Sequence, residues 1–286
     1  MNEDTTSKAL LKLTNYIINL TSKRQVFVLY DDSYPEINQV LHRSYGYWVD
    51  TVVLGCNSFD ALQFLLQKWQ AYRMAMRNMI VFCTSSSTVA LFQEVKARAM
   101  ESTTVTWFVI SRNDIKSQLE QVLREGTQIS LFTRQTETKY DMAITKVDSS
   151  SKVRIQSVGM WWTDDKGTHS FTSQPLLQDL PSVYSSFHGR HLIVSANNNW
   201  PFFGLRVLAD RKAEPTSGID VNILNALSRK LNFSYQVEVP PDRAWGGPQK
   251  DGSVTGLIGV VARQESHFAI CEITITDLMY YKLCKM

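Results

Sequence analysis

The hydrophobic positions in the first half of the chain form short runs that are separated by amphipathic segments. Four runs rich in β-branched and aromatic residues predict strands: QVFVLY (25–30), TVVLG (51–55), NMIVFC (78–83) and TVTWFVI (104–110). Because these runs are almost continuously apolar, they indicate a sheet that is covered on both faces.

Three other segments carry apolar residues at intervals of three and four, which predicts helices over residues 57–76, 87–100 and 113–126. The last of these segments ends at Gly126, a common residue just past a helix. The alternation of strand and helix predicts right-handed βαβ units. We therefore expect an α/β fold whose sheet is mainly parallel.

The pattern changes after residue 148. A stretch rich in Ser, Thr, Gln and Pro has neither helical nor strand periodicity, and we expect residues 161–188 to form a linker. A new strand, helix and strand follow it, so the sequence predicts one domain over residues 1–160 and a second over residues 189–286.

Charge and motifs exclude several classes of protein. The chain has 30 basic and 27 acidic residues without a basic run, so we expect no nucleic-acid partner. It contains no G-x-G-x-x-G after the first strand, no phosphate-binding loop and no G-x-S-x-G, so we expect no enzyme, no catalytic residue and no cofactor. Asp31 and Asp32 follow the first strand, where a ligand site is one interpretation. We prefer a solvated turn that caps the next helix.

The four cysteines fit no metal-binding spacing, and we expect no metal site. We interpret Cys56 and Cys83 as small buried residues at strand ends. A disulfide between them is the alternative if the compartment is oxidising. Whether Cys271 or Cys284 forms a disulfide stays open.

Two features of the sequence give opposite indications of the cellular compartment of the chain. No signal peptide opens the sequence, and no apolar run reaches the roughly 18 residues of a membrane helix. Taken literally, these absences describe an intracellular chain. Two glycosylation sequons, at Asn19 and Asn232, favour the secretory pathway instead.

Several motifs in the second half follow one another in a characteristic order. They are VGMWW, FHGRHLIVSA, NNNWPFF, LNFSY, DGSVTGLIG and ICEITIT, which together lie between residues 158 and 276. This order resembles the first extracellular ligand-binding segment of ionotropic glutamate receptors. The alternation of strands and helices over residues 25–147 is similar to the periplasmic-binding-protein fold of that family's amino-terminal domain. The resemblance therefore implies part of that domain followed by one lobe of a bilobed ligand-binding domain.

The resemblance also implies a ligand site. Thr274 corresponds to a threonine that binds the carboxylate of an amino-acid ligand, and the backbone carbonyl of Glu272 takes the place of one that receives the amino group. Thr276 lies on the same strand end, and Trp245 is a candidate for the aromatic residue that covers the ligand. Without the resemblance, both threonines read as an ordinary strand end.

Three positions depart from the family pattern. Glu272 replaces a proline and would repel an anionic ligand, His267 replaces an acidic residue, and Met279 stands where an arginine binds the ligand carboxylate. NNNWPFF and ICEITIT resemble the divergent chemosensory branch known as arthropod ionotropic receptors, in which such losses are common.

By this resemblance, the chain is the extracellular part of a ligand-gated cation channel subunit of the plasma membrane. Its partners would be a small amino-acid-like or other organic ligand and sister subunits. The pore helices lie outside this sequence, which we expect to be a fragment because DLMYYKLCKM, after Thr276, leaves the family pattern. The alternatives are a free-standing soluble binding module of periplasmic type and a cytosolic α/β enzyme.

Overall fold

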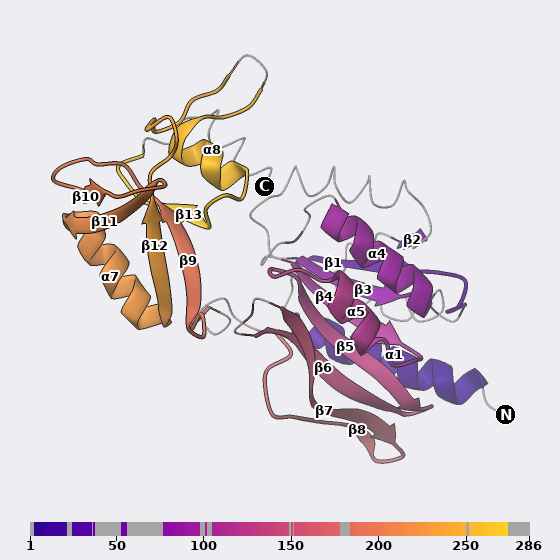
Figure 1. The fold of residues 1–286 in the computed structure, drawn as a ribbon. Coiled ribbons are helices and arrows are strands. Elements are labelled where there is room, and N and C mark those ends of the chain that lie inside the picture. Colours follow the sequence, from indigo (N-terminus) through magenta and orange to yellow (C-terminus); the bar gives the residue numbers. More distant parts are fainter. Residues whose placement is uncertain are drawn as a thin grey trace. The chain divides into compact units, whose positions relative to one another are not determined.

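A computed structural model gives the fold of the chain, which divides into two compact units, residues 1–180 and 181–286 (Figure 1). Each unit is described by itself. The described residues are 3–21, 25–35, 37, 53–55, 77–97, 101, 105–148, 150, 152–177, 184–249 and 252–273. The helix predicted over residues 57–76 lies outside them.

The first unit contains an eight-stranded sheet with the order β2-β1-β3-β4-β5-β6-β7-β8. Its strands are β1 (Gln25–Tyr30), β2 (Val53–Gly55), β3 (Arg77–Phe82), β4 (Val105–Ser111), β5 (Gln128–Thr136), β6 (Lys139–Val147), β7 (Val153–Asp164) and β8 (Gly167–Thr172). The pairs from β2 to β5 are parallel, and those from β5 to β8 are antiparallel. The predicted parallel sheet is therefore present, with an antiparallel extension.

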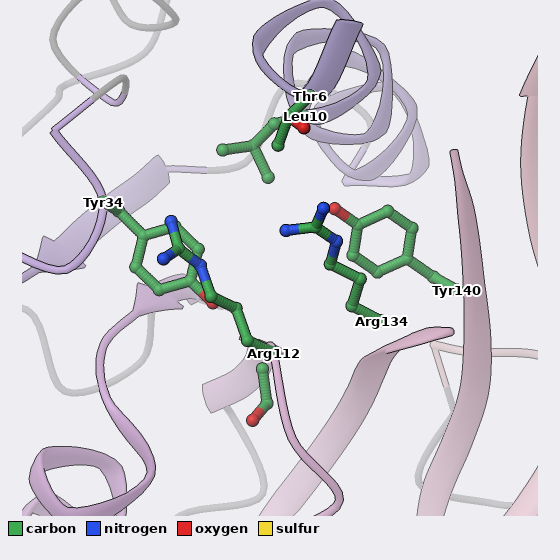
Figure 2. A pocket seen from close by; sticks show the side chains of 7 residues that line it. Thr6, Leu10, Tyr34, Arg112, Arg134 and Tyr140 are labelled. Carbon is green, nitrogen blue, oxygen red and sulfur yellow. The ribbon is translucent and has the colours of Figure 1, made fainter. Parts of the chain in front are cut away.

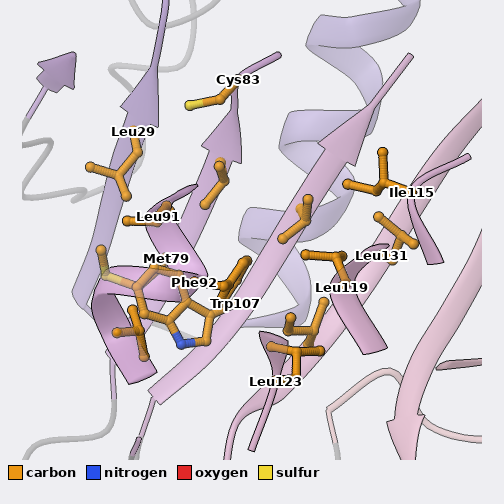
Figure 3. Packing of buried hydrophobic residues seen from close by; sticks show 14 of the residues in the cluster. Leu29, Met79, Cys83, Leu91, Phe92, Trp107, Ile115, Leu119, Leu123 and Leu131 are labelled. Atoms are coloured by element: carbon orange, nitrogen blue, oxygen red, sulfur yellow. The ribbon is translucent and has the colours of Figure 1, made fainter. Parts of the chain in front are cut away.

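Helices cover both faces of this sheet. Helix α1 (Glu3–Leu20) packs Leu10, Leu13 and Ile17 into one buried cluster, together with Phe108 of β4. Helices α4 (Ser85–Ala97) and α5 (Lys116–Val122) contribute to a second cluster on the opposite face, where Trp107 lies (Figure 3). Alternate residues of β4 thus point to opposite covered faces, as its uninterrupted apolar sequence predicted.

Two boundaries in the first unit differ from the sequence-based expectation. Helix α5 ends at Val122, and the extended Leu123 is buried, so Gly126 (φ +95°) lies in the turn that follows rather than at the helix end. Residues 161–164 and 167–172 form the end of β7 and the whole of β8, although they fall within the predicted linker. An antiparallel edge strand that buries little and is rich in Ser and Thr lacks the apolar signal on which the prediction rested.

The second unit contains a five-stranded sheet with the order β10-β11-β12-β9-β13. Its elements are β9 (Arg190–Ser195), β10 (Gly204–Val207), β11 (Lys212–Ser217), α7 (Ile219–Leu231), β12 (Phe233–Glu238), α8 (Gly256–Ala262) and β13 (Phe268–Ala269). Strands β12, β9 and β13 are parallel. Both units thus have the predicted α/β class.

Burial in the second unit is less complete than in the first. Val221 and Leu224 of α7 pack into the core beside Phe203, but Ile219, Ile223 and Leu227 of the same helix are exposed. No helix among the described residues is long and apolar enough to span a bilayer.

Candidate ligand-binding site

The predicted ligand residues lie partly within the described structure. Glu272 is exposed, just after β13, and Trp245 is 40% exposed, in the loop between β12 and α8. Thr274, Thr276 and Met279 lie outside the described residues, so their predicted roles stay predictions. Among the described residues, strand β13 comprises only Phe268–Ala269, is half-buried and pairs with β9.

Strand β13 is held in register with the end of β9. The backbone N–H of His267 donates to Ile193 O (2.9 Å), and the N–H of Ile193 donates to His267 Nδ1 (2.9 Å). The N–H of Ile270 then donates to Ser195 O (3.0 Å). The residues that follow both strands therefore leave the sheet at the same carboxyl edge, which is where open α/β sheets place their ligands.

Asn197 joins the Trp245 loop to this edge. Its side chain is buried, and its Nδ2 donates to Arg243 O (3.2 Å) and to Ala244 O (3.1 Å). Both acceptors immediately precede Trp245 in the chain. The loop that carries Trp245 is thus fixed beside the end of β9.

Asn199 joins the segment after β13 to the same edge. Its Nδ2 donates to Glu272 Oε2 (3.4 Å), and the Cys271 thiol donates to Asn197 O at 3.8 Å. The structure therefore brings the Trp245 loop and the Glu272 segment to one short stretch, Asn197–Asn199. The sequence analysis predicted no role for these asparagines of NNNWPFF. A run of Asn residues directly after an apolar strand is the feature of the sequence that indicates their position at the sheet edge.

The loop is also packed closely against the start of α8. The N–H of Gly256 donates to Asp242 Oδ2 (2.9 Å), and the N–H of Leu257 donates to Ala244 O (3.1 Å). Gly256 has φ +63°, and a β-carbon there would lie 2.4 Å from Ala244 O. Only glycine permits this backbone approach.

The charges at this edge are mixed. Burial raises the pKa of the free thiol of Cys271, and the charge of Asp220 adds to that increase. Glu272 presents an exposed carboxylate in the adjoining position, whereas the exposed Arg243 of the Trp245 loop is a cation.

Part of the second unit is similar to a known family. Residues 190–279 match the family model described as "Ligated ion channel L-glutamate- and glycine-binding site". The match supports the ionotropic glutamate receptor family for this part of the chain. It includes Met279, three residues beyond the point at which we expected the family pattern to end.

Two curated relatives match shorter stretches. The human "Glutamate receptor ionotropic, delta-2" is 37% identical over 65 residues, or 23% of this chain and 6% of the relative. A "Probable glutamate receptor" of Anas platyrhynchos is 39% identical over 67 residues, or 23% of this chain and 14% of the relative. The chain therefore spans a small part of either relative.

The solved structures that resemble the chain overlap it only partly. One is the Drosophila muscle GluRIIB complex with glutamate, which aligns with 32% of this chain and 36% of its own at 19% identity, with a TM-score of 0.28. So partial an overlap supports no further conclusion. The arthropod chemosensory branch stays a prediction.

Proposed function

We propose that the chain is the extracellular ligand-binding portion of a ligand-gated cation channel subunit of the ionotropic glutamate receptor kind. Residues 189–286 would supply the first segment of the ligand-binding domain, and residues 1–160 part of an amino-terminal domain. The observation that carries the proposal is the coincidence of the family match, residues 190–279, with the second unit.

In this proposal the ligand sits at the carboxyl edge of β9 and β13. The backbone carbonyl of Glu272 accepts from the ligand's amino group, Thr274 and Thr276 bind its polar end, and Trp245 covers it. Closure of a second lobe over the ligand would favour an open pore through the difference in ligand affinity between the two states. Sister subunits and the plasma membrane are the corresponding partners, and the function involves no catalysis.

The chemosensory role is part of the same proposal. Its support is a carboxylate at Glu272, amide side chains that hold the loops at the edge, and, in the sequence, Met279 in place of an arginine. Without an arginine at that position, the site would be suited to a small amine or another neutral organic ligand. Amino acids belong among the ligand candidates, because the matching family model is described by its binding of glutamate and glycine.

Residue Met279 provides the sharpest test. Residues 190–279 would replace the matching segment in the ligand-binding domain of the delta-2 relative, and glutamate, glycine and D-serine would be titrated calorimetrically. We expect the Met279→Arg graft to bind at least one of them about tenfold or more tightly than the unmodified graft, because arginine restores a bidentate carboxylate contact. The Met279→Gln graft is the uncharged control. A folded Met279→Arg graft with no gain over this control would contradict the placement.

The extracellular compartment is tested separately. Asn19 on α1 and Asn232 after α7 are both exposed, and Cys83 is disulfide-bonded, which favours an oxidising environment. When the chain is directed to the secretory pathway in animal cells, we expect its electrophoretic mass to fall on glycosidase treatment. Asn19→Gln and Asn232→Gln should each reduce this fall by the mass of one glycan. A chain without glycans at both positions would favour the cytosolic enzyme instead.

A further inference from the structure

Strand β8 forms one edge of the eight-stranded sheet in the first unit (Figure 1). It pairs with β7 on one side, and no described strand lies on the other. The N–H of Ser173, just after β8, donates to Val158 O (2.7 Å), so the backbone of Ser173 faces β7. Because these directions alternate along an antiparallel strand, the N–H and C=O groups of Thr168, Ser170 and Thr172 point away from β7.

These outward backbone groups are unpaired. Among the residues that the structure describes, none donates to or accepts from the outward N–H and C=O groups of Thr168, Ser170 and Thr172. Thr168 and Ser170 are also exposed. A row of unpaired backbone donors and acceptors at a sheet edge is a template for a further strand.

Strand β8 lacks the features that usually protect such an edge. Its sequence, GTHSFT, contains no Lys, Arg, Asp, Glu or Pro, and its ladder with β7 runs without a bulge. Phe171 is 67% exposed, more than any other large apolar side chain described in the first unit. The edge is therefore both open to pairing and partly apolar.

Phe171 belongs to an apolar and aromatic patch on one face of the edge. It pairs with Met160 of β7, and two positions earlier His169 pairs with Trp162. The rings of Trp162 and His169 are stacked, with centroids 5.3 Å apart. Because side chains alternate along a strand, these four lie on the face opposite Trp161, which is buried in the cluster that contains α1.

The sequence of β8 is complementary to itself in the antiparallel direction. A two-fold axis at Ser170 pairs Ser170 with its own copy and Thr168 with Thr172, and all three carry outward backbone groups. The same register places Phe171 of one copy opposite His169 of the other. Hydroxyl pairs and aromatic pairs stabilise antiparallel strands, and no like charges meet in this register because β8 contains no Lys, Arg, Asp or Glu.

A pocket of the same unit is too small for a polypeptide segment. Figure 2 shows it between α1 and the carboxyl edge of the sheet, where Thr6, Leu10 and Arg134 contribute to its lining. It has room for about one water molecule. The outer side of β8, in contrast, is accessible to an extended strand.

We propose that two copies of the chain associate through β8, with residues 168–172 of each copy paired antiparallel about Ser170. The two eight-stranded sheets then form one continuous sheet, and the pairing is closed because it covers the free edge of β8 in both copies. The ring of Phe171 packs against the stacked Trp162 and His169 of the other copy. So short a contact is smaller than a standard interface, and we expect a weak dimer that dissociates on dilution.

The association does not depend on the ligand site proposed for the second unit, because every residue it uses lies in the first. Failure of the strand pairing would therefore leave that site untouched, and failure of ligand binding would leave the pairing untouched.

Analytical ultracentrifugation of the 286-residue chain over a series of concentrations tests the association. We expect the unmodified chain to change from monomer to dimer as its concentration rises. Ser170→Pro removes an N–H that points away from β7, and each dimer loses two hydrogen bonds because Ser170 pairs with its own copy. This variant should weaken dimerisation about tenfold or more. Ser170→Ala keeps the N–H and is the matched control, with dimerisation unchanged.

Hydrogen exchange followed by NMR tests the register in the unmodified chain and does not depend on whether a variant folds. In the dilute monomer, the amides of Thr168, Ser170 and Thr172 should exchange quickly, and those of His169 and Phe171, which face β7, more slowly. Raising the concentration should protect the first three and leave the other two little changed.

Three results would overturn the proposal. One is a chain that stays monomeric at every concentration, including a chain whose outward amides are protected only when a different polypeptide is added. Another is a dimer without the alternating protection along β8. The third is equal dimerisation of the folded Ser170→Pro and Ser170→Ala variants.

Discussion

The carboxyl edges of the two sheets use their acidic side chains in different ways. In the first unit Asp31, after β1, is buried and accepts hydrogen bonds from the Ser33 N–H (3.0 Å) and the Thr84 N–H (2.7 Å). In the second unit Glu272, after β13, is exposed and receives one 3.4 Å hydrogen bond from Asn199. A carboxylate that saturates backbone donors is structural, whereas one left facing solvent at a sheet edge is available to a ligand.

The side chains that assemble the two edges also differ. The second edge is assembled by asparagines, which bring loops together without adding charge, whereas at the first edge the carboxylate of Asp31 joins the turn after β1 to the end of β3. Similar topological positions are thus built from different side chains. Position in an α/β sheet therefore indicates where a ligand binds, and only the side chains indicate what it is.

The largest expected loss of stability follows substitution of Gly256. Gly256→Ala introduces a β-carbon 2.4 Å from Ala244 O at a residue with φ +63°, so the Trp245 loop has to move away from α8. We expect a loss of about 2–4 kcal/mol in the free energy of unfolding of the second unit, measured by urea denaturation. Gly247→Ala is the control, since its β-carbon would meet nothing within 4 Å. Equal effects of the two substitutions would show that the close approach is not needed.

The next largest expected loss of stability follows substitution of Asp31, in the first unit. Asp31→Asn at pH 7 removes the charge that both backbone donors face, and we expect a loss of about 1–3 kcal/mol in the free energy of unfolding. Asp32→Asn, at the exposed neighbouring position, is the matched control and should change it by less than about 0.5 kcal/mol.

The Asp31→Asn and Asp32→Asn variants should also differ in how their stability depends on pH. Burial raises the pKa of Asp31, but the hydrogen bonds from Ser33 and Thr84 outweigh it and hold the pKa below its ordinary value of 3.8. A depressed folded-state pKa stabilises the fold above pH 3.8, and that contribution is lost as the pH falls through the folded-state value. Asp31→Asn should therefore flatten the decrease in stability below pH 4. An unchanged decrease would contradict this role.

These residues also show what the sequence can predict. The apolar runs of β1, β3 and β4 and the helical spacing of α4 identified the covered sheet correctly, because burial on both faces dictates composition locally. For Asp31 the expected turn is present, but the side chain is buried rather than solvated and accepts a hydrogen bond from Thr84, 53 residues away. Strand β8 was missed because an edge strand with a largely exposed surface has no apolar signature.

The candidate site could be predicted only in part for the same reason. The motif order located Glu272 and Trp245 on one unit, but the residue that fixes the Trp245 loop, Asn197, makes contacts 46 and 47 positions away. The pattern of residues along one sequence does not show which distant residues form such hydrogen bonds.

Asn197 offers a smaller effect that tests the assembly of the second edge. Asn197→Ala removes two part-buried side-chain hydrogen bonds to loop carbonyls, and we expect a loss of about 1–2 kcal/mol in the free energy of unfolding, measured by urea denaturation. The fluorescence of Trp245, isolated by difference against Trp245→Phe, should shift as well. Asn199→Ala, which removes contacts with Cys271 and Glu272 but none with the Trp245 loop, should leave that fluorescence unchanged.

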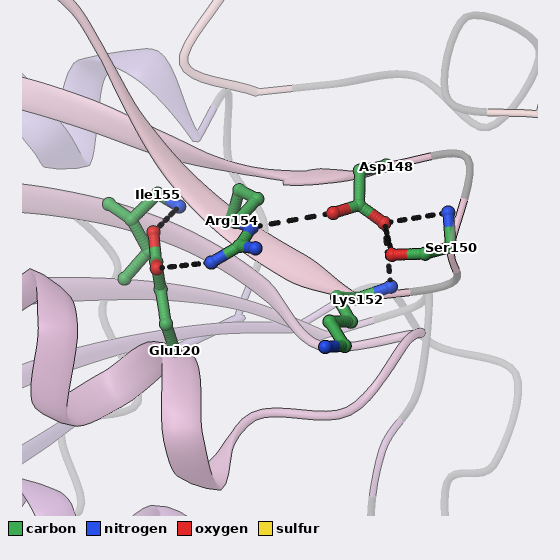
Figure 4. Close-up of polar contacts among 6 residues, drawn as sticks. All are labelled: Glu120, Asp148, Ser150, Lys152, Arg154 and Ile155. Carbon is green, nitrogen blue, oxygen red and sulfur yellow. Dashed lines mark hydrogen bonds and ion pairs between the residues drawn. The ribbon is translucent and has the colours of Figure 1, made fainter.

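The smallest expected effect concerns a carboxylate of the first unit that faces solvent yet resembles Asp31. Asp148, in the β6–β7 turn, accepts hydrogen bonds from the Ser150 hydroxyl (2.6 Å) and the Lys152 N–H (3.0 Å), and Arg154 bridges it to Glu120 (Figure 4). These hydrogen bonds, that from the Ser150 hydroxyl first, lower the pKa of Asp148 to about 2.

Carboxyl-carbon NMR should therefore show Asp148 titrating near pH 2, with its small stabilising contribution present above pH 4 and lost as the pH falls through 2. Ser150→Ala should raise this midpoint more than Arg154→Gln does, because the ion pair with Arg154 is exposed and weakened by solvent. The reverse order would mean that charge, rather than hydrogen bonding, holds this carboxylate. The distinction drawn between Asp31 and Glu272 would then not extend to solvent-facing turns.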